Sequence, residues 1–313
     1  EGHLAMGERY PKHRLAFNRS IHVEARSESL SSDGGALLLR EGLEQLGAIE
    51  AITRDLEDPR DPRYVRHSLA KLLQGQVLLL AQGWKAQANA DRLFDDPVLA
   101  SAHSDRRGMQ ASEDWLPSQS SFSRTLDILS RPGNAQKVET APMRLAGLRM
   151  RAMGKKGRKP KVLTIDVDGL PLQAHGEQPG VAYNGHVKAS IHYPLIASCG
   201  ETGDMLAARL REGNASPAAE APDWIPQVVA EAESYLCDKA RVRVDAGFTD
   251  GKTLDALEER GIEFMGRLRE NPRLQRMAQP YLEPGPGRPP KKPREHVIEA
   301  TYQADSWARE RRL

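Results

Sequence analysis

The stretch Val162-Leu163-Thr164-Ile165-Asp166-Val167-Asp168-Gly169 decides the fold class of this chain. Its β-branched and apolar residues predict a buried strand, and the acids and the glycine at its end place carboxylates at a sheet edge. Upstream of Lys161 the apolar residues recur with helical spacing, and downstream of it strand-like segments dominate. We therefore expect a helical N-terminal part followed by an α/β domain.

Downstream of this strand, periodicity and turn residues predict further elements. In chain order they are a strand at 186–198, a strand or short helix at 204–213, a helix from about 217 to 236, a strand at 240–248, a helix at 249–261 and a strand at 262–268. After Asn271 the chain becomes rich in Pro and Gly, and 297–304 suggests one more strand. Strands that alternate with helices are typical of a sheet with flanking helices.

Upstream, apolar residues at helical spacing predict helices at 36–47, 64–84, 88–97 and 118–129. Gly47 is expected to end the first of these helices, because glycine readily adopts the left-handed conformation of a helix terminus. No repeat of fixed period is visible. The N-terminal part is therefore expected to be a helical domain.

The chain has 313 residues, of which 39% are hydrophobic and 28% charged. This length favours two domains, and this composition is typical of globular proteins. No apolar run approaches the ~20 residues of a membrane span, and no signal-peptide pattern is present. We therefore expect a cytoplasmic protein without membrane association. Cys199 and Cys237 are expected to be buried, reduced thiols.

The net charge is only +2, but the positive charges are unevenly distributed. The segment 144–161 carries basic residues and no acid, namely Arg144, Arg149, Arg151, Lys155, Lys156, Arg158, Lys159 and Lys161. A second basic block, at 285–294, lies in a Pro/Gly-rich setting. Each block alone is typical of a solvated linker, but two of them around a candidate catalytic region favour a polyanionic partner.

Two aspartates end predicted strands, Asp168 after the first and Asp245 after the strand at 240–248. Carboxylates at the ends of adjacent strands can hold Mg²⁺, which takes one or two carboxylates together with phosphate oxygens. Either residue could instead be an ordinary loop or cap residue. Arg241 and Arg243 alternate on the strand before Asp245 and could face phosphates or solvent.

The order of many short segments resembles a known family. The segments DVDG, HGEQPGVAYNGHVKASIHYPLIA, LREGNA, VRVDAGF and GIEFMGRLREN, together with SSDGGALLLREGLEQLG, DPRDPRYVRHSLAKLLQGQVLLLAQGW, DDPVL and SQSSFSRTLD, resemble the DDE transposases of bacterial insertion sequences. The specific resemblance is to the group 1 type, whose RNase H-like core is interrupted by an inserted domain. It covers the chain from about Ile21 onward.

The resemblance implies a metal-dependent transposase. Its first acid is Asp168, with Asp166 as the near alternative, and its second acid is Asp245. It implies Mg²⁺ or Mn²⁺ as cofactor, double-stranded DNA as partner at transposon ends and target, and a homodimer in the active complex. Water would cut the transposon end, and the freed 3′-hydroxyl would attack target DNA. Arg243 and the basic residues of 144–161 are expected to bind DNA.

The resemblance also implies a domain order and a third acid. We expect an N-terminal extension at 1–30, a helical DNA-binding domain at 31–155, an incomplete RNase H-like core at 156–270 and the start of a β-rich inserted domain at 271–313. The family's third acid is a Glu in the pattern Tyr-x-x-Arg-x-x-x-Glu, which this sequence lacks. The chain is therefore expected to be C-terminally truncated.

Two other interpretations stay open. The segment TIDVDG also resembles the first motif of haloacid-dehalogenase-type phosphatases, in which Asp166 would be the nucleophile and Asp168 the general acid. That interpretation leaves the N-terminal half unexplained. The third interpretation is a DNA-binding transposase remnant without catalytic activity.

Overall fold

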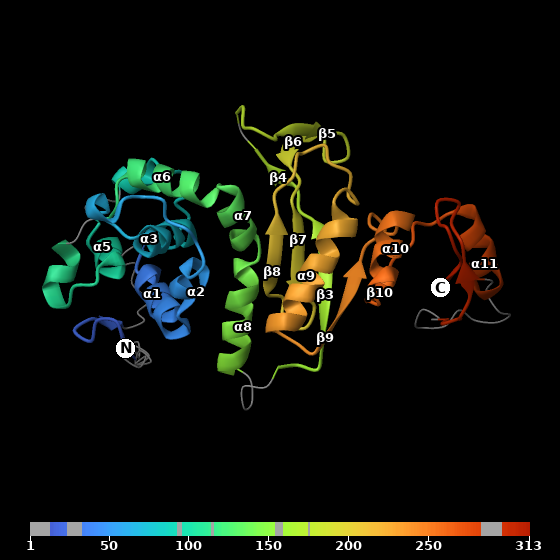
Figure 1. The fold of residues 1–313 in the computed structure, drawn as a ribbon, viewed down its shortest axis with the longest axis horizontal. Coiled ribbons are helices and arrows are strands. Elements are labelled where there is room, and N and C mark those ends of the chain that lie inside the picture. Colours follow the sequence, from blue (N-terminus) through green and yellow to red (C-terminus); the bar gives the residue numbers. More distant parts are fainter. Residues whose placement is uncertain are drawn as a thin grey trace, which may run out of the picture. The chain divides into compact units, whose positions relative to one another are not determined.

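The computed structural model describes residues 13–23, 33–92, 96–113, 116–153, 159–174, 176–282 and 296–313. The chain divides into an N-terminal unit, Glu1–Arg158, and a C-terminal unit, Lys159–Leu313. The first unit is helical and the second combines helices with sheets (Figure 1). This confirms the expected fold class, a helical part followed by a mixed sheet with flanking helices.

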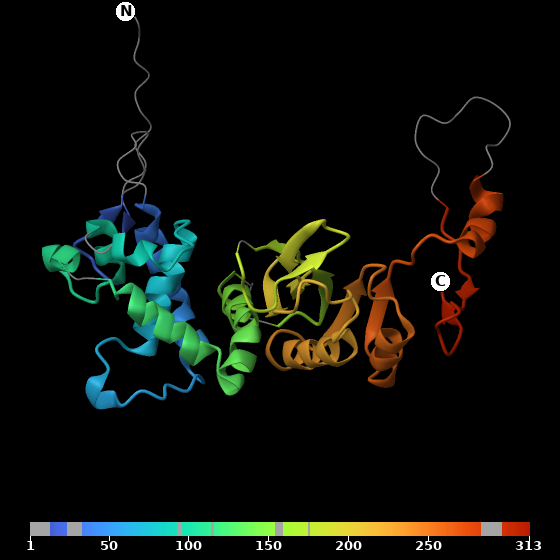
Figure 2. The ribbon, with the colours of Figure 1, turned by 90° about the horizontal axis from the view of Figure 1, so that it is seen from above.

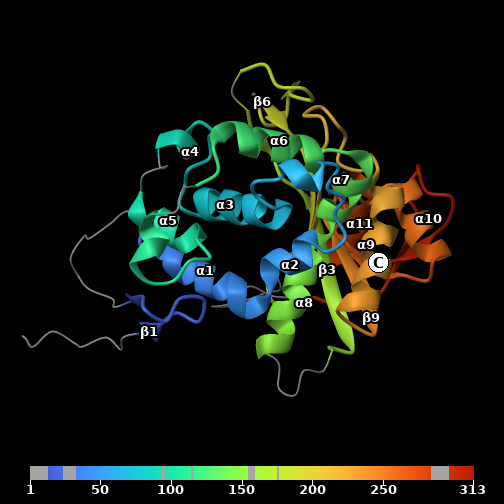
Figure 3. The same ribbon diagram turned by 60° about the vertical axis from the view of Figure 1, so that its left-hand side comes forward.

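The N-terminal unit consists mainly of helices with one short ribbon. Its helices are α1 (Gly35–Leu46), α2 (Ala48–Thr53), α3 (Leu69–Ala81), α4 (Asn89–Arg92), α5 (Pro97–His103), α6 (Gln119–Leu129), α7 (Pro132–Glu139) and α8 (Ala141–Met153), with short 3₁₀ turns at Pro62–Tyr64 and Gly108–Glu113. Strands β1 (His13–Arg14) and β2 (His22–Val23) pair antiparallel. Helix α3 packs against α1, α5 and α6 (Figure 3).

Capping residues determine where the helices of this unit begin and end. Two of these helices begin at residues other than the sequence predicted. Gly47 ends α1 with a φ of 60°, as expected. The helix expected at 64–84 begins only at Leu69, because the Ser68 hydroxyl accepts a hydrogen bond from the first turn. Pro97 begins α5 rather than ending a helix: the Asp96 side chain caps this turn, and a proline in the first turn loses no intrahelical hydrogen bond.

A buried polar cluster lies beside the apolar core of the N-terminal unit. The Arg40 side chain is only 4% exposed and donates to the carbonyl oxygens of Ala102 and His103. Lys71 donates to the same His103 carbonyl oxygen and pairs with Asp105 at 2.6 Å. The cluster thus satisfies the C-terminal carbonyl groups of α5 with two cations from other helices.

The C-terminal unit is built on a five-stranded mixed sheet. Its strands are β3 (Val162–Gly169), β7 (Leu195–Cys199), β8 (Met205–Arg209), β9 (Lys239–Val244) and β10 (Glu263–Gly266), and their lateral order is β10-β9-β3-β7-β8. β9 runs parallel to both β3 and β10, whereas β7 runs antiparallel to β3 and β8. The sheet is therefore mixed, and its first and fourth strands along the chain, β3 and β9, are neighbours.

The two faces of this sheet differ. Residues of β9 alternate between exposed and buried, and the buried ones are Ala240, Val242 and Val244. Helices α9 (Ala221–Tyr235) and α10 (Gly251–Glu259) pack on one another and on the sheet (Figure 2). The side chains at 241, 243 and 245 therefore share the other face, because successive side chains of a strand point to opposite faces.

The segment at 186–198 is two strands and not one, which corrects the sequence prediction. β6 (Ala189–His192) joins β4 (Leu172–Gln173) and β5 (Ala182–Asn184) in a separate three-stranded sheet, while β7 belongs to the main sheet. The break falls at Tyr193 and Pro194. Proline lacks the amide hydrogen that continuous pairing needs and restricts the residue before it.

The C-terminal segment also departs from expectation. Helix α11 (Pro272–Leu282) follows Asn271, whose side-chain oxygen accepts hydrogen bonds from the amides of Arg273 and Leu274. The strand expected at 297–304 is reduced to β11 (Thr301–Tyr302), paired with β12 (Arg311–Arg312). An N-terminal cap and a proline in the first turn made a helix possible where the Pro/Gly content suggested none.

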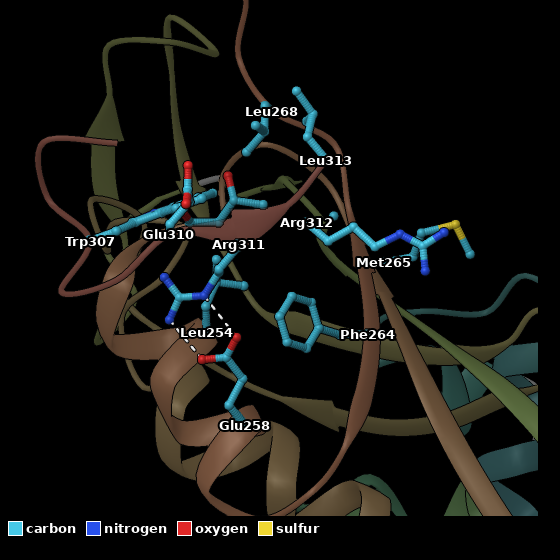
Figure 4. Close-up of a pocket in the computed structure, with 12 residues that line it drawn as sticks. Leu254, Glu258, Phe264, Met265, Leu268, Trp307, Glu310, Arg311, Arg312 and Leu313 are labelled. Atoms are coloured by element: carbon cyan, nitrogen blue, oxygen red, sulfur yellow. Dashed lines mark hydrogen bonds and ion pairs between the residues drawn. The ribbon is translucent and has the colours of Figure 1, made fainter. Parts of the chain in front are cut away.

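A cavity of about 670 Å³ lies between the C-terminal residues 307–313, α10 and β10 (Figure 4). Trp307, Phe264 and Leu254 supply its apolar lining, and Arg311 donates to the Glu258 carboxylate at its wall. None of the candidate acids lines it.

Cys199 and Cys237 are buried and form no disulfide, which confirms that they are free thiols. None of the described helices combines the length and the apolar character required to cross a bilayer.

Candidate active site

The two candidate acids stand side by side at one edge of the main sheet. In the parallel pairing of β3 with β9, Asp166 lies opposite Arg243 and Val167 lies opposite Val244. Asp168 and Asp245 are the next residues along the two strands, so they occupy neighbouring positions on the same face. Neighbouring strands are separated by ~4.8 Å. The strands that bear the two acids are thus neighbours, as a metal site shared by both acids requires.

Each of these carboxylates is oriented by a nearby backbone amide. Oδ1 of Asp168 accepts a hydrogen bond from the Gly169 amide at 2.7 Å, and Oδ1 of Asp245 accepts one from the Gly247 amide at 2.8 Å. No described residue donates to the second oxygen of either carboxylate. Both side chains are exposed, so these second oxygens are available to an external ligand.

Asp166 has a different environment, although it lies on the same face. Its two oxygens accept hydrogen bonds from Nε and Nη2 of Arg243, at 2.7 and 2.6 Å. This two-point ion pair raises the pKa of the exposed Arg243 guanidinium. A carboxylate engaged by an arginine at both oxygens is a poor ligand for a metal ion, because the cation already neutralises its charge.

An open cavity of about 480 Å³ adjoins the acids. Its lining residues are Asp166, Val167, Asp168, Arg243, Val244, Asp245, Met265, Gly266 and Arg267. The cavity therefore combines carboxylates with two guanidinium groups, which suits a site for metal ions and phosphate.

Tyr193 is a neighbour of the acids that the sequence did not reveal. A Cβ atom added to Gly169 would meet the Tyr193 ring at 2.5 Å, so the ring lies directly beside the residue after Asp168. Burial raises the pKa of the Tyr193 phenol above its usual range. The Asp168 and Asp245 charges raise this pKa further, and Arg211 opposes them. The tyrosine follows the strand β6, and no motif or spacing singles it out.

The expected DNA-binding residues of 144–161 lie in two different units. In the N-terminal unit, Arg144 pairs with Asp55 at 2.6 Å, Arg149 donates to the sulfur of Met153, and Arg151 is exposed near the end of α8. Lys155, Lys156 and Arg158 lie outside the described residues, as does the second basic block at 285–294. The ion pair of Arg144 with Asp55 therefore links α8 to the segment after α2.

In the C-terminal unit, Lys159 donates to the carbonyl oxygen of Ser234 at 2.6 Å, and Lys161 is exposed just before β3. Asp168 lies at the other end of that strand. At ~3.3 Å per residue, the backbones of Lys161 and Asp168 are about 23 Å apart. These two lysines and the acid pair therefore lie at opposite ends of the strands.

The donor set at the acid pair fits a hard divalent ion. Two carboxylates with free oxygens suit Mg²⁺ or Mn²⁺, which completes its coordination with water and substrate phosphate. Within the described ranges no cluster of three His, Cys, Asp or Glu side chains is arranged to bind a metal ion. The described part of the site therefore supplies two carboxylates, those of Asp168 and Asp245.

No curated protein matches the chain. The solved Mos1 transposase paired-end complex with left transposon end is similar over 72% of this chain and 74% of that chain, at 14% identity and a TM-score of 0.23, a likeness too slight to support any argument. The model of the family described as transposase DDE domain group 1 matches residues 13–313, nearly the whole chain. The chain therefore belongs to the transposase DDE domain group 1 family.

Proposed function

We propose that this transposase uses Asp168 and Asp245 to hold Mg²⁺ or Mn²⁺ for cutting and joining DNA at insertion-sequence ends. The supporting observation is the register of β3 and β9. Asp168 and Asp245 directly follow the paired residues Val167 and Val244, so both carboxylates lie on the same face of the sheet. Family membership supports the transposase function itself. When bound, such ions withdraw charge from a phosphate and make a neighbouring water more acidic.

The chain's own residues prepare the site for this chemistry. The amides of Gly169 and Gly247 fix one oxygen of each acid, so the second oxygens are oriented before any ligand arrives. Asp166 holds Arg243 beside the pair, and the Nη1 group of Arg243 is left to approach a phosphate. We assign Asp168 rather than Asp166 as the first acid, because only Asp168 is free of an arginine.

We also propose the partners and the location. The substrate is double-stranded DNA at transposon ends and at the target, bound by Arg243 and the basic segment 144–161. A homodimer would give each of the two ends its own pair of acids. The protein would act in the bacterial cytoplasm, where that DNA is found.

Cleavage of a DNA duplex that carries the insertion-sequence end tests this proposal. The 313 residues alone, without the third acid, should bind this DNA and nick it little. A protein that also carries the Glu implied by the family resemblance should show Mg²⁺-dependent nicking, which falls to background in Asp168→Asn and in Asp245→Asn with DNA binding retained. Asp238→Asn is the matched control, because Asp238 is exposed at the opposite end of β9. Full nicking by either acid variant would refute the assignment.

The phosphatase interpretation is not favoured. Its nucleophile would be Asp166, whose oxygens are both engaged by Arg243. Its lysine would be Lys239, which pairs with Glu263 at 2.5 Å and lies opposite Val162, at the far end of β3 from the acids. Turnover of an aryl phosphate that is lost in Asp166→Asn would revive this interpretation and contradict ours.

A further inference from the structure

The sheet edge that carries the acids holds two more side chains, one on each side. Arg267 follows β10, and its amide donates to the Val244 carbonyl oxygen at 3.2 Å, which puts it opposite Asp245. Tyr193 precedes β7, whose first residue, Leu195, lies opposite Gly169. Along the edge, the order is therefore Arg267, Asp245, Asp168 and Tyr193.

Arg267 differs from the other cations on this face. Lys239 pairs with Glu263, Arg241 donates to the Thr164 hydroxyl, and Arg243 is bound by Asp166. The Arg267 side chain is exposed, lines the acid cavity and forms no ion pair with a described residue. Its full charge is thus available to an anion at this edge.

Tyr193 is held rigidly with its hydroxyl unused. The Arg211 Nε donates to the Tyr193 carbonyl oxygen at 3.0 Å, and the Tyr193 amide donates to the Arg211 carbonyl oxygen at 3.3 Å. The Arg211 guanidinium carbon lies 5.5 Å from the centre of the tyrosine ring, and this arginine is 5% exposed. No described residue forms a hydrogen bond with the phenol oxygen, which lies beside Gly169.

We propose that Tyr193 and Arg267 bind the phosphates on either side of the one that reaches the acids, so that the DNA strand runs along the sheet edge. This inference rests on the proposed function of Asp168 and Asp245. Phosphate contacts by Tyr and Arg side chains position a nucleic acid without reading its sequence. The tyrosine supplies a neutral hydrogen-bond donor, and the arginine supplies a charge.

Removing each side chain should change DNA binding in a different way: one changes its salt dependence and the other its affinity. We would measure binding of a fluorescein-labelled duplex of arbitrary sequence over a range of KCl concentrations, in the presence of Mn²⁺. Arg267→Gln should reduce the slope of log K against log salt by about 0.9, because the variant neutralises one phosphate fewer. Tyr193→Phe should weaken binding by about tenfold with the slope unchanged, because it removes a neutral hydrogen bond to a charged group.

Matched variants separate these effects from general damage. Arg267→Lys should keep the wild-type slope. Arg260→Gln changes an exposed arginine at the opposite end of β10, and Tyr183→Phe changes an exposed tyrosine of the small sheet. Both should bind DNA like the wild type.

Direct Mn²⁺ binding distinguishes failure of this inference from failure of the proposed function. Tyr193→Phe and Arg267→Gln should bind Mn²⁺ normally, whereas Asp168→Asn and Asp245→Asn should not. A wild-type slope in Arg267→Gln, or wild-type affinity in Tyr193→Phe, overturns the inference and leaves the metal site intact. Loss of Mn²⁺ binding in either variant also overturns it, because the side chain would then serve the metal site.

Discussion

At the scale of single residues, the pattern of the sequence does not distinguish Asp166 from Asp168 as the first metal-binding acid. Residues two apart on a strand share one face, so alternation could not decide between them. The decision comes from Arg243, on the neighbouring strand, which engages both oxygens of Asp166. A contact between residues 77 positions apart depends on the register of two strands, which a single sequence does not specify.

The closeness of Gly169 to Tyr193 gives a first prediction. Gly169→Ala places a Cβ 2.5 Å from the tyrosine ring, which is too close to be accommodated without movement. We expect a loss of about 1–3 kcal/mol in unfolding free energy, measured by urea denaturation. Tyr193→Ala should relieve much of this loss in the double variant, so that the two effects are not additive. Gly185→Ala, in open space, is the control, and equal losses in both glycine variants would refute the close approach of the ring.

His103 gives a second prediction, on pH. Burial lowers the pKa of His103 from 6.5 to about 4, with Lys71 adding to the effect. Between these pH values the unfolded chain binds a proton that the folded chain does not. The contribution of neutral His103 to the free energy of unfolding is therefore complete above pH 6.5. It is lost as the pH falls towards 4, by up to about 3 kcal/mol. Hydrogen exchange of the α3 amides should report this loss.

His103→Gln is the variant that tests this assignment. Glutamine does not titrate, and its amide can still donate to the Lys71 carbonyl oxygen that His103 Nε2 contacts at 3.2 Å. The variant should show a smaller loss of protection between pH 6.5 and 4. An unchanged pH dependence would assign the effect to the carboxylates of the unit.

At the scale of elements, periodicity predicted those segments whose pattern is uninterrupted. The strands β3, β9 and β10 and the helices α1 and α10 lie where the sequence placed them. Three of the failures occurred at prolines, in addition to the late start of α3 and the short strand β11. Pro194 splits an expected strand between two sheets, Pro97 begins a helix where an end was expected, and Pro272 begins a helix where no element was predicted. A proline inside a strand or helix removes a backbone hydrogen bond, whereas a proline in the first turn of a helix does not. Only the cap residue beside the proline distinguishes the two cases.

Helix α10 follows the loop that begins at Asp245, and its cap gives a third prediction. The Asp250 side chain accepts hydrogen bonds from the amide and the hydroxyl of Thr253, at 3.1 and 2.6 Å. Asp250→Ala should lower the unfolding free energy by about 1 kcal/mol, because the first turn loses its acceptor. Thermal unfolding measures this, with Asp238→Ala as a control at an exposed site. Equal melting temperatures for the two variants would mean that the cap contributes nothing.

At the scale of the whole molecule, the sequence predicted the order of a helical unit and an α/β unit, and the family membership of the chain. It also placed Asp168 and Asp245 at the ends of two β-branched strands, which are neighbours in the sheet. Their role as metal ligands stays a prediction. It could not find Tyr193 or Arg267, whose roles depend on which strands are neighbours. The basic segment 144–161 spans the division between the two units, after Arg158.

That basic segment gives a fourth prediction. If it binds DNA phosphates, replacing Lys155, Lys156, Arg158 and Lys159 with glutamine should reduce the slope of log K against log salt by up to ~0.9 for each phosphate that is no longer neutralised. The measurement is DNA binding across a range of salt concentrations. The control is replacement of as many exposed lysines and arginines elsewhere in the chain. A slope equal to that of the wild type would make the segment a linker only.

We propose that Asp168 and Asp245 together hold divalent ions and that Asp166 does not. Titration of the protein with Mn²⁺, followed by electron paramagnetic resonance, tests it most directly. We expect Asp168→Asn and Asp245→Asn each to weaken Mn²⁺ binding by more than about tenfold, since each loses a ligand and its charge. Asp166→Asn should change it much less. Strong loss in Asp166→Asn with normal binding in Asp168→Asn, or normal binding in all three variants, would show that Asp168 and Asp245 are not the metal ligands.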